Sequence, residues 1–113
     1  MVKTILITGA TDGIGKHLAK KLASEGHHVI LHGRNPQKLE LALQEVRAVS
    51  LRGRVSSYLA DFSKLDDVYR FVEEIKRDFQ SIDVLFNNAG LYAGKERKAS
   101  AKNVELTFML SVL

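Results

Sequence analysis

Residues 8–15, Thr-Gly-Ala-Thr-Asp-Gly-Ile-Gly, decide the fold of this chain. The apolar run directly before them, Thr4-Ile5-Leu6-Ile7, is typical of a buried parallel strand. Directly after them, Ile14, Leu18 and Leu22 recur every four residues, which predicts a helix. A strand, a glycine-rich turn and a helix in this order are the context in which a dinucleotide-binding turn is expected.

Each glycine of the turn has a separate physical role. Gly9 allows a sharp turn off the strand, Gly13 lets the backbone approach a pyrophosphate, and Gly15 lets the helix pack closely on the sheet. The unpaired N–H groups at the helix start then form an anion site. The alternative is a tight connection that binds nothing. The binding interpretation assigns cofactor contacts to Gly9, Thr11, Asp12, Gly13, Ile14 and Gly15.

The rest of the chain alternates between strand and helix patterns. Strands are expected at residues 3–8, 28–32, 54–60 and 82–86, and helices at 13–25, from Asn35-Pro36 to before Gly53, at 65–79 and from 104 onward. Gly26 is expected to end the first helix, and Asn35 and Ser63 to cap the next two. This alternation predicts an α/β fold, a Rossmann-type doubly wound parallel sheet with strand order 3-2-1-4. The buried helix faces are predicted at Leu39, Ala42, Leu43, Val46, Val68, Phe71, Val72 and Ile75.

Composition narrows the class of protein. The chain has 113 residues, 45% hydrophobic and 27% charged, which suits one globular domain. It has no cysteine, so disulfides and thiolate metal sites are excluded, and its four histidines lack metal-ligand spacing, so no metal site is expected. The net charge of +4 is spread along the chain, which argues against nucleic-acid binding. With no signal-like start and no long apolar run, we expect no membrane association and a cytoplasmic location.

The residues after the second strand select the cofactor. An acidic residue at this place binds the ribose 2′-hydroxyl of NAD, but the sequence His32-Gly33-Arg34-Asn35 has no carboxylate before Glu40. Arg34, with Lys38 one helical turn further on, is suited to a 2′-phosphate. We therefore expect Arg34, Asn35 and Lys38 to favour NADP (NADPH) over NAD, unless Arg34 is only a solvated loop residue.

Two further polar segments follow strands three and four. Asp61 is placed to accept a hydrogen bond from adenine while the Phe62 backbone lines the pocket; the alternative is that Asp61 caps the next helix. Asn87-Asn88-Ala89-Gly90 closes the fourth strand and is also compatible with a simple turn.

Both motifs together, Thr8-Gly-x-x-x-Gly-Ile-Gly and Asn87-Asn-Ala-Gly, resemble those of the short-chain dehydrogenase/reductase family. The resemblance implies a bound NAD(P), with Asn87 tying neighbouring strands together and with Asn88, Ala89 and Gly90 bordering the cofactor. It covers the whole chain but only about the first half of the family's usual length. Residues 105–108 are similar to the lead into the family's fifth helix, particularly in retinol-dehydrogenase-like members, and the family's catalytic asparagine then aligns with Ser111.

The family's catalytic tyrosine is followed by a lysine four residues later. Here Tyr58, Tyr69 and Tyr92 are followed at that spacing by phenylalanine, glutamate and glutamate. Without this pair and the family's serine, the chain is expected not to turn over, because a tyrosine of pKa about 10 is a poor base at neutral pH. Residues 1–113 are thus interpreted as an NADP-binding domain without the catalytic half.

The resulting functional hypotheses differ in class. The first is the cofactor-binding portion of an oxidoreductase that moves a hydride between NADPH and a carbonyl or alcohol. The second is a non-catalytic NADP-binding or subunit-pairing module, and the third is a remnant that binds nothing. An open apolar edge at residues 84–86 and the helix from residue 104 predict self-association or a partner subunit.

Overall fold

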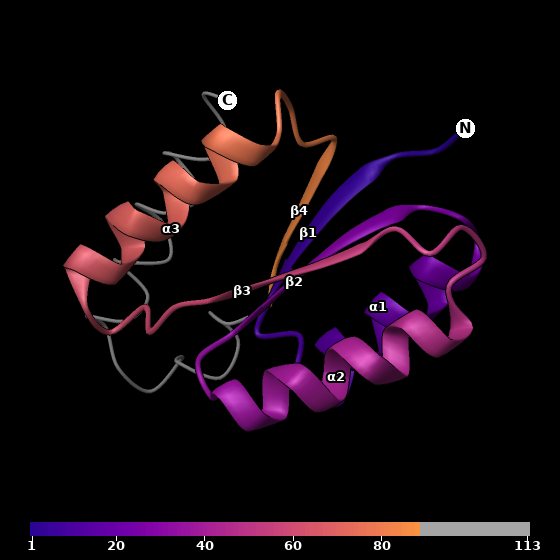
Figure 1. Ribbon diagram of the computed structural model, residues 1–113, viewed down its shortest axis with the longest axis horizontal. Coiled ribbons are helices and arrows are strands. Elements are labelled where there is room, and N and C mark those ends of the chain that lie inside the picture. Colours follow the sequence, from indigo (N-terminus) through magenta and orange to yellow (C-terminus); the bar gives the residue numbers. More distant parts are fainter. Residues whose placement is uncertain (89–113) are drawn as a thin grey trace.

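A computed structural model, which describes residues 1–88, places four strands in one parallel sheet between helices (Figure 1). The spatial order β3-β2-β1-β4 confirms the predicted order. The elements are β1 (Thr4–Thr8), α1 (Gly13–Ser24), β2 (His28–Gly33), α2 (Pro36–Val49), β3 (Val55–Leu59), α3 (Leu65–Asp78) and β4 (Val84–Asn87). The expectations for Ala89, Gly90, Tyr92, Ser111 and the helix from residue 104 lie outside the described residues.

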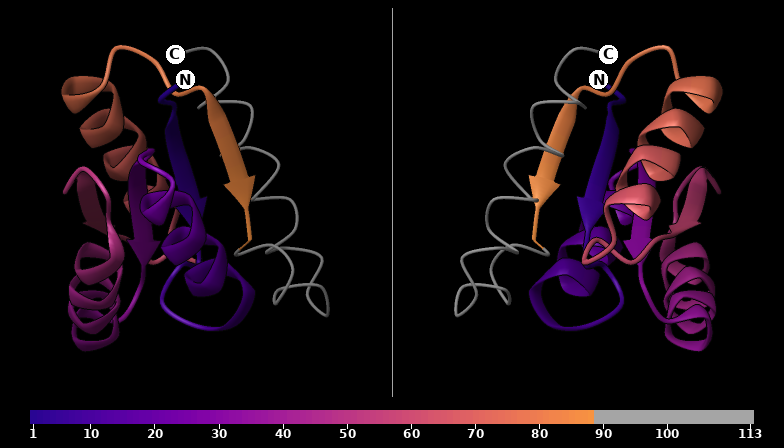
Figure 2. Two further views of the ribbon diagram at one scale, coloured as in Figure 1. Left: turned by 90° about the vertical axis from the view of Figure 1, so that its right-hand side faces the viewer. Right: turned by 90° about the vertical axis from the view of Figure 1, so that its left-hand side faces the viewer.

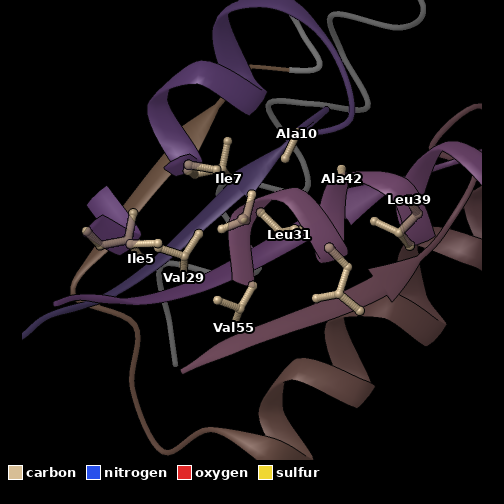
Figure 3. Packing of buried hydrophobic residues seen from close by; sticks show 12 residues of the cluster. Ile5, Ile7, Ala10, Val29, Leu31, Leu39, Ala42 and Val55 are labelled. Atoms are coloured by element: carbon tan, nitrogen blue, oxygen red, sulfur yellow. The ribbon is translucent and has the colours of Figure 1, made fainter. Parts of the chain in front are cut away.

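Alternation along the strands divides the core into two layers. Ile5 and Ile7 of β1 point toward α1 and α2, whereas Leu6 points toward α3. The side views show α3 on one face of the sheet and α1 with α2 on the other (Figure 2). Figure 3 shows side chains of the layer on the α1 and α2 side, which pack between the strands and these two helices. Every residue predicted for the buried faces of the second and third helices is buried.

Two details of the helices differ from expectation. Ile14 was expected to continue the apolar stripe of α1, but it is 59% exposed, because the helix buries Gly15, Ala19 and Ala23 instead. Leu18 and Leu22 of the expected stripe pack only at the border of the core.

The predicted cap at Ser63 is wrong. Lys64 occupies the N-cap position of α3, and its side chain makes no capping hydrogen bond. Ser63 instead donates from its N–H and from Oγ to Oδ1 of Asp61, at 3.0 and 2.7 Å, so it stabilises the turn before the helix.

Asn35 caps α2 as predicted, with its side-chain oxygen accepting from the Lys38 N–H at 3.0 Å and Pro36 at the first helical position. Replacing Asn35 with alanine is expected to lower the free energy of unfolding by about 1 kcal/mol, because that N–H loses its partner. Urea denaturation measures the change. Gln37→Ala, an exposed substitution in the same helical turn, is the control and is expected to leave stability nearly unchanged.

The strand at the end of the sheet is the surface at which self-association is predicted. Within residues 1–88, β4 lies at one end of the sheet and Val84 is 40% exposed. Self-association through this edge stays a prediction.

Among the described helices, none is both long and apolar enough for a membrane span.

Candidate functional site

The candidate site lies where the carboxyl ends of the four strands meet. Because all pairings are parallel, the residues that follow each strand share one edge of the sheet. Thr8 pairs with Asn87, and Gly33 pairs with Leu59, so the strands end nearly level. The glycine turn, Arg34, Asp61 and Asn88 are therefore brought to one edge, as the sequence predicts.

The glycine turn has the backbone that the sequence predicts. Gly9 and Gly13 have φ angles of 63° and 53°, in the left-handed region that favours glycine. Asp12 is the N-cap of α1, but its side chain makes no capping hydrogen bond, and no acidic side chain lies in the first helical turn. The N–H groups of that turn are thus not neutralised by the helix's own residues, which suits an anion.

Gly15 sits in a space with no room for a side chain. A Cβ atom at this position would lie 2.5 Å from the Gly9 carbonyl oxygen and 2.6 Å from Nδ2 of Asn88. Because Gly15 has only a hydrogen atom in place of this Cβ, α1 can approach the end of β1 closely. This close packing is the role predicted for Gly15.

Asn87, the last residue of β4, and Asn88, directly after it, contact the glycine turn and β1. Oδ1 of Asn87 accepts from the Thr8 hydroxyl at 2.9 Å, which joins β4 to β1 as the family resemblance implies. Asn88 is fully buried, and its Nδ2 donates to the Gly9 carbonyl oxygen at 2.9 Å. Within residues 1–88, Oδ1 of Asn88 has no hydrogen-bond partner. A buried acceptor left in this state is unfavourable by about 1–3 kcal/mol, so it fits a position beside a polar ligand.

His32, at the end of β2, holds the other side of the turn. Its Nδ1 accepts from the Gly9 N–H at 3.0 Å, and its carbonyl accepts from the Ala10 N–H at 2.9 Å. Since Nδ1 accepts, Nε2 carries the proton and donates to the Ala60 carbonyl oxygen, 2.9 Å away. The ring is stacked on Phe62 with centroids 3.9 Å apart.

Burial lowers the pKa of His32 to about 4, although the Ala60 carbonyl and the Asp61 carboxylate act weakly in the opposite direction. The ring is therefore neutral at physiological pH, the only state in which Nδ1 is an acceptor. From the sequence, the four histidines were considered only as metal ligands, so this role of His32 was missed. The available signal is a polar residue closing an apolar strand at the glycine-turn edge.

Two of the predicted selector residues, Arg34 and Lys38, are exposed, and each lies near an acid. Nζ of Lys38 is 3.4 Å from Oδ2 of Asp12, and Arg34 is close enough to Asp61 to help lower that carboxyl's pKa. The Lys38–Asp12 side chains are 59% and 68% exposed, so the ion pair contributes at most about 1 kcal/mol.

Asp61 and Phe62 follow β3 at the same edge. Hydrogen bonds from the Ser63 hydroxyl and N–H hold the pKa of Asp61 below its ordinary value, with desolvation opposing and Lys64 and Arg34 assisting. Asp61 is therefore an ionised acceptor at neutral pH. Its side chain holds the turn before α3 through Ser63, whereas Lys64 is the N-cap of the helix, so the alternative that Asp61 caps the next helix is wrong. Contact of Asp61 with adenine stays a prediction.

Gly33 brings the glycine turn and the selector segment together. A Cβ on Gly33 would lie 2.5 Å from Cγ2 of Thr11, so the glycine makes room for the turn to pack over the end of β2. Thr11 thus lies directly beside the segment that begins with Arg34.

This geometry agrees with comparisons across the whole chain. The family model described as short chain dehydrogenase matches residues 3–112. The chain belongs to the short chain dehydrogenase family. Its members are oxidoreductases that bind a nicotinamide dinucleotide.

Individual relatives match this chain over only part of their own length. Retinol dehydrogenase 13 of Mus musculus is 36% identical over 89 residues, which are 79% of this chain and 27% of the relative. The structure of a short chain dehydrogenase from Escherichia coli CFT073 has a TM-score of 0.77 and 29% identity, over 96% of this chain and 53% of that one. A metagenomic short-chain oxidoreductase in complex with NADP has a TM-score of 0.66 and 31% identity, over 75% of this chain and 38% of that one. This short chain dehydrogenase sequence therefore spans about a quarter of that curated relative and about half of the Escherichia coli structure.

Proposed function

We propose that residues 1–113 form the NADP-binding portion of an oxidoreductase that moves a hydride between NADPH and a carbonyl or alcohol. One observation carries the proposal. The uncapped start of α1, closely packed through Gly15, lies at the same sheet edge as Arg34. NADPH, when bound, supplies the hydride, and the residues described here bind and orient it.

The charges favour the 2′-phosphate of NADP. Arg34 presents planar donors that suit phosphate oxygens, and Lys38 adds a second cation within the same segment. The nearby acid Asp12 is largely exposed and is held only by a weak ion pair. Asp61 engages Ser63 through Oδ1, which leaves Arg34 as the principal selector.

The remaining contacts follow from the same edge. Asp61, ionised, is placed to accept from the adenine amino group with Phe62 beside it, and the unpartnered Oδ1 of Asn88 suits a ribose hydroxyl. Thr11, Asp12, Gly13 and Ile14 line the pyrophosphate, with Gly9 and Gly15 shaping the turn. The NADP complex of the metagenomic relative and the name of retinol dehydrogenase 13 support an NADP cofactor and an alcohol or carbonyl substrate class.

Titration of the purified chain with NADPH and NADH, followed by nicotinamide fluorescence at constant salt, tests the proposal. NADPH is expected to bind more tightly than NADH. Arg34→Ala is expected to weaken NADPH binding by about tenfold to a hundredfold, because charge-assisted hydrogen bonds contribute about 1.5–3 kcal/mol, and to leave NADH binding nearly unchanged.

Arg52→Ala is the matched control. Arg52 is an exposed arginine in the connection between α2 and β3, which lies at the opposite edge of the sheet. Arg52→Ala removes the same charge as Arg34→Ala and is expected to change the affinities for NADPH and NADH little. Equal affinity for the two nucleotides, or equal effects of the two arginine variants, would contradict the role of Arg34. No saturable binding by the folded chain would contradict the proposed function itself.

A further inference from the structure

We infer that His32 is a positioning residue of the nucleotide site, which holds the phosphate-binding turn in its binding geometry through the Gly9 N–H. The inference rests on the proposed function and adds a residue outside the glycine turn and the selector segment.

The backbone of Gly9 is held from two sides. The left-handed φ of 63° turns the chain off β1, and both polar groups of this residue are then held by side chains from neighbouring strands. The N–H donates to Nδ1 of His32 on β2, and the carbonyl accepts from Nδ2 of Asn88 after β4. The turn is therefore clamped from both sides of β1.

The other ring nitrogen extends the clamp to β3. Nε2 donates to the carbonyl of Ala60, the residue directly before Asp61 and Phe62. The ring also stacks on Phe62 and meets Phe71 of α3 edge-on, with centroids 5.3 Å apart. One buried side chain, 4% exposed, thus connects the proposed pyrophosphate turn to the proposed adenine segment. A rigid turn binds more tightly, because less ordering accompanies binding.

Two substitutions separate the two hydrogen bonds. The side-chain oxygen of asparagine lies where Nδ1 of the ring lies, so His32→Asn keeps an acceptor for Gly9 and loses the donor to Ala60. The amide of glutamine reaches the place of Nε2, so His32→Gln keeps a donor for Ala60 and leaves the Gly9 N–H without its acceptor. Both variants lose the ring stacked on Phe62, and they differ in which of the two hydrogen bonds they keep.

NADPH titration of both variants is the test, at a temperature where circular dichroism shows each to be folded. His32→Asn is expected to bind about tenfold more tightly than His32→Gln, since an unpaired buried N–H is the less favourable state. His28→Asn is the control, because His28 lies at the other end of β2, where its Nε2 contacts Ser56 Oγ at 3.1 Å. The His28→Asn variant is expected to bind NADPH with the affinity of the unaltered chain.

A spectroscopic readout does not depend on nucleotide. In the unaltered chain, nitrogen NMR is expected to show the Nε2–H tautomer of His32 and a coupling across the Gly9 N–H···Nδ1 hydrogen bond. The opposite tautomer would overturn the inference. Equal NADPH affinities of the two variants, or affinities that merely follow their thermal stabilities, would also overturn it. In either case, NADPH binding by the unaltered chain would leave the proposed function standing. Failure of the unaltered chain to bind NADPH would overturn both.

Discussion

Replacing Gly15 with alanine is expected to destabilise the chain by about 2 kcal/mol and to weaken NADPH binding by at least about tenfold. The new Cβ would lie 2.5 Å from the Gly9 carbonyl oxygen and 3.2 Å from the Ala10 Cα, both backbone atoms that cannot rotate away. It would also lie 2.6 Å from Nδ2 of Asn88, on the hydrogen bond that this amide makes to Gly9. Helix α1 must therefore move away from the sheet, and its N–H groups move with it.

The sign of this effect is informative. Glycine to alanine inside a helix normally stabilises by up to about 1 kcal/mol, so intrinsic propensity predicts the opposite result. Thermal and urea denaturation with NADPH titration measure both changes. His17→Ala is the control, because His17 is exposed on the same helix two residues later. A Gly15→Ala chain as stable as the unaltered one would show that α1 does not pack on the turn as described.

Acidification is expected to destabilise the chain through His32 before most carboxylates titrate. Its pKa is about 4 in the folded state, below the ordinary 6.5, so the unfolded chain binds more protons between these values. The stabilisation linked to the neutral ring is complete above pH 6.5 and is lost as the pH falls through 4. This residue alone is expected to lower the free energy of unfolding by about 2 kcal/mol between pH 7 and pH 5, and by about 3 kcal/mol by pH 4.

Urea denaturation at a series of pH values measures this linkage, and His32→Gln isolates it. Burial together with a nearby arginine also lowers the pKa of His28, so some acid sensitivity is common to the chain and the variant. The difference in free energy of unfolding between the unaltered chain and His32→Gln is expected to shrink steadily from pH 7 to pH 5. A difference that stays constant over this range would contradict a buried neutral His32.

The arrangement of the glycine turn explains which of its groups remain for a ligand. The N–H groups of Gly9 and Ala10 are used within the protein, both by His32. The N–H groups at the start of α1 donate no hydrogen bond to the Asp12 side chain. Anion binding is therefore expected at the helix start, while the residues before it act as a rigid support.

Local patterns along the chain were sufficient for most of the fold. Apolar runs and four-residue periodicity predicted each described strand and helix to within a few residues, and their alternation predicted the strand order. Asn35 and Gly26 were predicted correctly because capping depends on residues only a few positions away. Ser63 was not, because Asp61 competes for its N–H and hydroxyl.

The sequence by itself determined the parallel α/β sheet and brought the glycine turn, Arg34, Asp61 and Asn88 to one edge, since parallel strands share a direction. Only the tertiary structure decided which side chains meet across that edge. His32 and Gly9 are 23 residues apart, and Lys38 and Asp12 are 26 apart. No local pattern encodes such contacts, because they depend on strand register and on how closely α1 approaches the sheet. The same distance in sequence explains why the role of His32 emerged only once β1, β2 and β3 were side by side.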